Sequence, residues 1–183
     1  HIRTIDSLSN VNKIDSLNSI FTNKTISQEY ELEALLALSY YPELKDTRIE
    51  FRKTKIRTTM NSRPAVLSLF FRSKENRLYI IRINERLKDS IINYYSIPFN
   101  AKIGLFGHEI AHIKDYNGKN LFQIIGRLLS YMKKESKSAF EKEIDIITIE
   151  HGLGWQLYDW ADYVLNRSNA KRKYKTFKKE IYL

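Results

Sequence analysis

The feature that most constrains this chain is the pentad His108-Glu109-Ile110-Ala111-His112, which stands in a stretch whose apolar spacing predicts a helix. Residues four apart lie on the same helix face, so His108 and His112 can direct both imidazoles at one metal ion. Glu109 follows the first histidine directly, where its carboxylate can reach water beside that ion. The pentad therefore predicts a helical metal site that carries its own general base.

The two histidines leave this site incomplete, because catalytic zinc commonly takes three protein ligands and keeps one position open. A predicted helix over 138–151 supplies the candidates. Glu141 and Asp145 lie one turn apart on one face of that helix, so one can bind the metal while the other accepts the free N–H of a ligand histidine. Glu143 faces the opposite side. We therefore expect Glu141 as the third ligand beside Asp145, with His151 as the next choice.

The remaining pattern predicts an α+β fold, with a small antiparallel sheet ahead of a mainly helical half. Residues 26–41 favour a helix that Thr25 and Gln28 cap as a capping box. Short segments rich in β-branched and aromatic residues predict strands at 47–51, 65–72 and 78–83. A loop at 58–63 precedes Pro64, and a hairpin turn is expected at 73–77.

From about residue 86 the pattern turns helical. Asn100 is the candidate cap of the motif helix, and Gly118 is its expected end. Further helices are predicted over 120–132, 138–151 and 155–165, with Gly152 ending the second of them. The helix over 120–132 favours a core or lid position, with a membrane-surface helix as the alternative.

Length and composition indicate one domain over 25–166, preceded by an arm (1–24) and followed by a basic tail (167–183). The arm is either a weak helix or a loosely docked segment, and whether it covers a cleft stays open. The chain has no cysteine, which excludes disulfides, zinc–thiolate sites and a cysteine nucleophile. It begins with His1 and not with Met, which is compatible with an exported or periplasmic protein, so the compartment stays open.

The net charge of +10 is compatible with nucleic acid, an anionic membrane or an acidic substrate, but a lysine-rich solvated surface is its commonest meaning. No run of 18 apolar residues predicts a transmembrane segment, which leaves peripheral membrane contact as an alternative. The basic tail is no recognisable nucleic-acid module, so nucleic acid is not the expected partner. The oligomeric state is open.

With the pentad and the run Phe140-Glu141-Lys142-Glu143-Ile144-Asp145, the chain resembles the gluzincins, the wide thermolysin-like class of zinc peptidases. The second run is similar to the F-E-x-x-x-D pattern of CAAX-processing and heat-shock membrane proteases, and the likeness covers about residues 101–155. Ile144 departs from the alanine that often stands before the aspartate. No subfamily is assigned.

The resemblance implies a zincin-like fold in which one zinc ion is held by His108, His112 and Glu141 and activates water. It also implies that Glu109 is the general base and that an edge strand holds an extended peptide or protein substrate. An additional donor normally stabilises the oxyanion, and His151 is one candidate. The other candidates are three tyrosines, Tyr116, Tyr158 and Tyr163.

Two other interpretations stay open at this point. A DNA-associated metalloprotease would use the basic tail, although no DNA-binding module is recognisable. A zincin-like fold kept as a non-catalytic binding or regulatory module would be free to lose its base. The chain keeps Glu109 together with both histidines, which favours chemistry.

Overall fold

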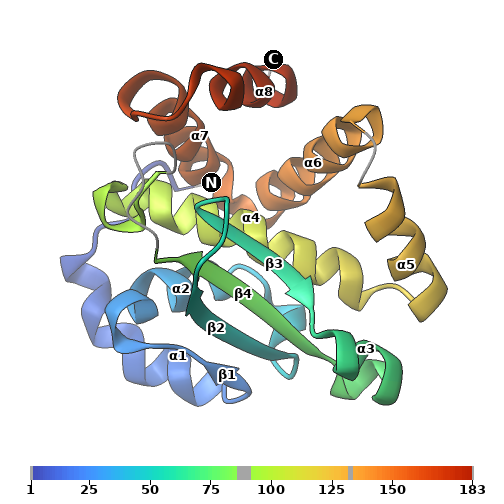
Figure 1. Cartoon of the computed structure of the whole chain (residues 1–183). Coiled ribbons are helices and arrows are strands. Elements are labelled where there is room, and N and C mark those ends of the chain that lie inside the picture. The colour runs from blue at the N-terminus through green and yellow to red at the C-terminus, as the bar shows by residue number, and fades with distance from the viewer. Residues whose placement is uncertain (1, 86–91, 132–133, 183) are drawn as a thin grey trace.

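The computed structural model describes residues 2–85, 92–131 and 134–182, and shows a mixed α+β fold in which helices surround a four-stranded sheet (Figure 1). The strands are β1 (Lys24–Thr25), β2 (Arg48–Thr54), β3 (Met60–Pro64) and β4 (Leu78–Asn84), in the order β1-β2-β4-β3. β1 and β4 each run parallel to β2, whereas β3 runs antiparallel to β4. The sheet is therefore mixed, and the prediction of an antiparallel sheet is wrong. The segment between β2 and β4 is long enough to make a parallel crossover.

Two predicted segments between β2 and β4 have exchanged roles. Residues 65–72, predicted as a strand, form helix α3 (Val66–Phe71), and residues 58–63, predicted as a loop, contribute to β3. Pro64 has no N–H to donate, so it ends the pairing of β3 with β4 and does not begin a new strand. The predicted hairpin turn at 73–77 contains the 3₁₀ helix η4 (Lys74–Asn76), which leads into β4. The strands predicted at 47–51 and 78–83 are confirmed as β2 and β4.

The N-terminal arm is docked on the domain. It contains the 3₁₀ helix η1 (Leu8–Lys13) and helix α1 (Ile14–Ile20), and it buries Ile5, Leu17 and Phe21 in the core. The side chain of Asn100 accepts a bond from the Ile5 N–H at 2.8 Å and donates to the Ile5 carbonyl at 3.0 Å. Asn100 thus binds the arm to the motif helix, and the prediction that it caps this helix is wrong.

The predicted helix over 26–41 is shorter than expected. It consists of the 3₁₀ turn η2 (Gln28–Tyr30) and helix α2 (Glu31–Leu38), and the 3₁₀ turn η3 (Pro42–Leu44) follows it. The predicted capping box does not form, because Thr25 belongs to β1 and pairs with β2. Five consecutive residues of α2, Ala34–Leu38, are buried, so this helix belongs to the core.

The motif helix α4 (Phe99–Asn117) runs beside β3 and is flanked by α2, α6 and α7 (Figure 1). It follows the 3₁₀ turn η5 (Tyr94–Ser96) and begins after Pro98, two residues before the expected cap. It ends at Gly118, as predicted. Ile103, Phe106 and Ile110 are completely buried along one side of it. This packing places one side of α4 in the core, while its other side faces a pocket.

The C-terminal half is helical, as predicted. It comprises α5 (Leu121–Ser130), α6 (Lys134–Thr148), the π-helical turn η6 (Ile149–Leu153), α7 (Gly154–Asp162), the π-helical turn η7 (Tyr163–Arg167) and α8 (Arg172–Tyr182). Gly152 has φ of 92° and breaks the helical path, as expected. Residues of the predicted basic tail form α8, which packs on α6. The helical start expected at 86 lies outside the described residues. Within the described ranges no helix is long and apolar enough to cross a bilayer.

Candidate metal centre

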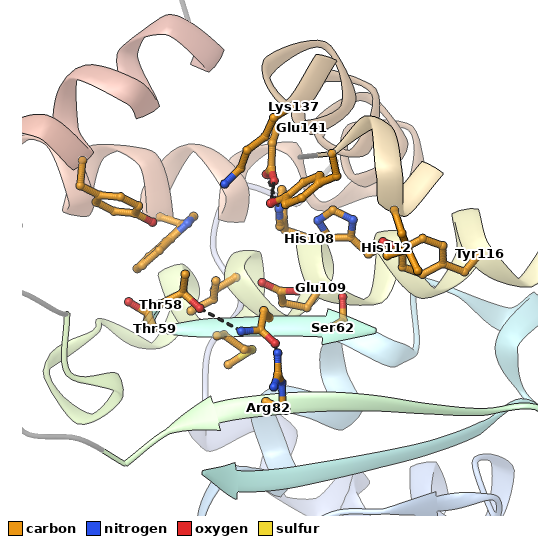
Figure 2. A pocket seen from close by; sticks show the side chains of 17 residues that line it. Thr58, Thr59, Ser62, Arg82, His108, Glu109, His112, Tyr116, Lys137 and Glu141 are labelled. Atoms are coloured by element: carbon orange, nitrogen blue, oxygen red, sulfur yellow. Dashed lines mark hydrogen bonds and ion pairs between the residues drawn. The ribbon is translucent and has the colours of Figure 1, made fainter. Parts of the chain in front are cut away.

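Helices α4 and α6 bring together the two histidines of the pentad and the predicted third ligand. One potential ligand atom from each of His108, His112 and Glu141 lies within 4.8 Å of the others. All three side chains are buried, and Figure 2 shows them grouped at one end of the pocket. Two imidazole nitrogens and one carboxylate oxygen are a donor set suited to catalytic zinc.

Asp145 fixes the orientation of the first histidine. Its Oδ1 lies 2.7 Å from Nδ1 of His108, so the N–H of that nitrogen donates to the carboxylate. Nε2 of the same ring points at Glu141, whose Oε2 is 3.2 Å away. This is the arrangement that a histidine ligand needs, with one nitrogen anchored and the other directed at the metal.

The second carboxylate oxygen of Glu141, Oε1, accepts a hydrogen bond. The hydroxyl of Tyr131, which follows α5, donates to Oε1 at 2.5 Å. Oε2 is the oxygen that faces His108. The two oxygens thus have different surroundings, and Oε2 is the one oriented to bind a cation.

His112 is enclosed by rings and has an unsatisfied nitrogen. Its imidazole packs against Phe140, with ring centroids 5.2 Å apart, and stacks on Tyr116 at 6.3 Å. Its Nδ1 is buried without a hydrogen-bond partner among the described residues. A buried imidazole that lacks such a partner is costly unless another group binds the ring. The environment of His112 therefore fits a metal ligand.

The electrostatics of the cluster favour positive charge at one position. Burial lowers the pKa of His108, but the carboxylates of Asp145 and Glu141 outweigh that effect and raise the pKa to about 10. Burial and the neighbouring charge of His108 lower the pKa of His112 to about 3. The two carboxylates thus stabilise a cation between the helices, and His112 stays neutral, as a metal ligand must be.

A pocket of about 310 Å³ opens directly beside these side chains. Glu109 lines it, is buried, and lies between the histidines and β3 (Figure 2). Residues 58–62 form the wall opposite α4, where Asn61 accepts a bond from Nε of Arg82 at 2.7 Å. The remaining lining residues come from α4 and from the C-terminal helices: Leu105, His108, His112, Tyr116, Leu128, Tyr131, Lys137, Glu141, Trp160 and Tyr174.

His151 does not line the pocket, so the structure does not support the alternative that it is a ligand or an oxyanion donor. It stacks on Tyr41 with ring centroids 4.3 Å apart, and its two nitrogens lie 2.7 Å from the Ile147 carbonyl and 2.8 Å from Glu43. Of the other candidate donors, Tyr116 lines the pocket.

The two remaining tyrosines lie elsewhere. Tyr158 is exposed, and the hydroxyl of Tyr163 donates to Ser96. Sequence reasoning missed Tyr131, Arg82 and Asn61. None of these carries a local signal, because each becomes part of the site through tertiary contacts.

Comparisons of the chain with protein-family models, with curated proteins and with solved structures found no match. The chemistry of the site itself is therefore the guide to its function.

Proposed function

We propose that this protein is a zinc-dependent metallopeptidase with a zincin-like arrangement of the gluzincin type. The observation that carries the proposal is the convergence of His108, His112 and Glu141, with ligand atoms within 4.8 Å, beside a pocket that Glu109 also lines. A structural zinc site is normally closed by four protein ligands, whereas three ligands beside a cavity leave one position for water or substrate.

The donor set selects zinc over the common alternatives. Magnesium and calcium prefer oxygen ligands, and a site with two imidazoles and one carboxylate suits a metal of the zinc type. A zinc ion held by these three side chains would act as a Lewis acid that activates water and polarises a carbonyl group. Asp145 and Tyr131 keep two of the three ligands in the required orientation.

Glu109 is the general base in this proposal. Its carboxylate lies in the pocket between the histidine pair and the strand wall, where it can take a proton from water and pass it to the leaving amine (Figure 2). Tyr116 is the remaining candidate for the oxyanion donor. Burial raises the pKa of its phenol well above the usual value, so its hydroxyl stays protonated and able to donate.

The position of β3 supports a peptide substrate. β3 is the last strand in the sheet order, and its residues Met60–Ser62 line the pocket opposite α4. An edge strand offers backbone N–H and C=O groups to an extended chain that lies beside it. A peptide bound in this way would pass the three candidate ligands and Glu109.

The decisive experiment compares the wild-type chain with Glu109→Gln, using zinc content and cleavage of an unbiased mixture of peptides. We expect both proteins to bind one zinc ion, and we expect the variant to lose cleavage by at least about a hundredfold, as removal of a general base does. Glu143→Gln is the matched control, because its side chain is half exposed and faces away from the pocket.

Each other outcome has a defined meaning. Full cleavage by Glu109→Gln would remove the mechanism. Stoichiometric zinc without cleavage by the wild-type chain would favour a non-catalytic module. Absence of zinc after the metal is supplied would count against every version of the proposal.

A further inference from the structure

Helices α3 and α5 expose an unusual amount of apolar surface. α3 exposes Val66, Leu67, Phe70 and Phe71, and α5 exposes Phe122, Leu128 and Leu129. Phe71 and Phe122 are each 82% exposed. In contrast, each helix has a single buried residue, Leu69 in α3 and Ile124 in α5. We call these seven exposed side chains the α3–α5 patch.

The two helices belong to one surface because the segments next to them are bonded together. Arg77, which is buried, donates to the Lys119 carbonyl at 2.8 Å, and Lys74 donates to the Gly118 carbonyl at 3.4 Å. These bonds join the chain after α3 to the loop before α5. Figure 1 shows both helices on the same side of the molecule.

α5 is also held firmly in place. Its first turn has a complete capping box made by Asn120 and Gln123. Arg127 forms an ion pair with Asp115 of α4 at 3.2 Å and a second one with Glu143 of α6. The apolar side chains of α5 are therefore presented by a fixed helix.

The charge around the patch is strongly positive. Residues 63–77 and 114–131 together contain seven basic residues and two acidic ones, Glu75 and Asp115. Lys119 and Arg127 form ion pairs with Asp115, and Arg127 forms another with Glu143, so the charges of these two basic residues are already balanced. Arg63, Arg72 and Lys74 are exposed next to α3. Projecting aromatic and aliphatic side chains with basic neighbours are the features that bind an anionic bilayer surface.

We propose that the α3–α5 patch binds the surface of a membrane that contains anionic lipids, with the phenylalanines inserted at the boundary between headgroups and acyl chains. A second copy of this chain suits the patch poorly, because two chains that each carry +10 repel one another. The proposal does not depend on the peptidase activity.

The location of the patch gives the attachment a consequence for the pocket. Leu128 belongs to the patch and also lines the pocket. β3, which forms the opposite wall, leads through Pro64 and Ala65 directly into α3. A chain attached through this patch would therefore hold the pocket close to the bilayer, within reach of peptides that lie on the membrane surface. This consequence rests on the proposed peptidase function.

The test is co-sedimentation of the full chain with vesicles of phosphatidylcholine alone and with vesicles that also contain phosphatidylglycerol. We expect binding to the anionic vesicles to be at least about tenfold tighter and to weaken as salt is added. The double variant Phe71→Ser with Phe122→Ser keeps the net charge, and we expect it to bind the anionic vesicles at least about tenfold more weakly.

Leu8→Ser is the matched control, because Leu8 is 84% exposed but lies in the arm, on the other side of the molecule from α5 (Figure 1). It should bind as the wild type does. Leu129→Ser provides a second patch variant, and thermal melting checks that each variant is folded. Failure of the wild type to bind anionic vesicles would overturn the proposal. Unchanged binding by both patch variants, or self-association through the patch in place of vesicle binding, would overturn it as well.

Discussion

The carboxylate of Asp145 lies 2.7 Å from Nδ1 of His108, and this contact links the two helices that carry the candidate ligands. Both groups are buried, so water does not weaken the bond. The contact determines which nitrogen of His108 carries the proton and therefore which one can bind a metal ion. The first candidate ligand is therefore oriented by a residue that need not touch a bound metal ion.

Replacing Asp145 by asparagine tests this orienting role. Asparagine keeps the size of the side chain but removes the negative charge that holds the Nδ1–H of His108. We expect zinc affinity to fall by about 10- to 100-fold, the usual cost of losing such a partner. Competition with a chromophoric chelator measures it. Asp162→Asn is the control, because Asp162 is a partly exposed residue of α7 that pairs with Arg167, and this change should leave the affinity unaltered.

Replacing Glu141 by alanine should weaken zinc binding more than any change to its neighbours on α6. Loss of a direct ligand should exceed the roughly 100-fold upper range for a supporting residue. Glu143→Ala is the comparison, because Glu143 pairs with Arg127 on the outer side of the helix. Equal losses in the two variants, measured by the same chelator assay, would show that the wrong carboxylate has been assigned.

Tyr131→Phe removes the hydroxyl that donates to Oε1 of Glu141 at 2.5 Å and leaves the ring in place. We expect zinc affinity to fall by about tenfold, less than for Glu141→Ala, because the ligand itself remains. Thermal melting of the metal-free protein should change little. A drop in melting temperature without a change in zinc affinity would assign Tyr131 a packing role alone.

The parts of the site that the sequence predicted are those that depend on local periodicity. The four-residue spacings of His108 with His112, and of Glu141 with Asp145, place side chains on one face of a helix wherever that helix goes. The structure brings these two faces together. Tyr131 and Arg82 had no such signal, because their proximity to the pocket arises from the way α5 and β4 pack.

The wrong predictions about the fold have the same origin. Residues 58–63 are mostly polar because this edge strand faces the pocket, so they resemble a loop in the sequence. Residues 65–72 resemble a strand because they form a short run rich in apolar and aromatic residues, yet most of those side chains are exposed on α3.

The last prediction concerns the packing of the motif helix. A Cβ atom built on Gly104 would lie 2.0 Å from the carbonyl oxygen of Gln156, so α4 and α7 approach each other through bare backbone at this point. Because the obstructing atom belongs to backbone, no side chain can rotate away. Gly104→Ala should lower the free energy of unfolding by about 3 kcal/mol, the upper end for ordinary overpacking, or more.

Gly126 provides the opposite case within the same chain. A Cβ atom at this position of α5 meets nothing within 4 Å, so Gly126→Ala should raise the free energy of unfolding by about 1 kcal/mol through helix propensity alone. Urea denaturation of both variants measures the two effects. If Gly104→Ala proved as stable as Gly126→Ala, the close contact of α4 with α7 would be wrong. The placement of His108, one turn further along α4, would then be in doubt as well.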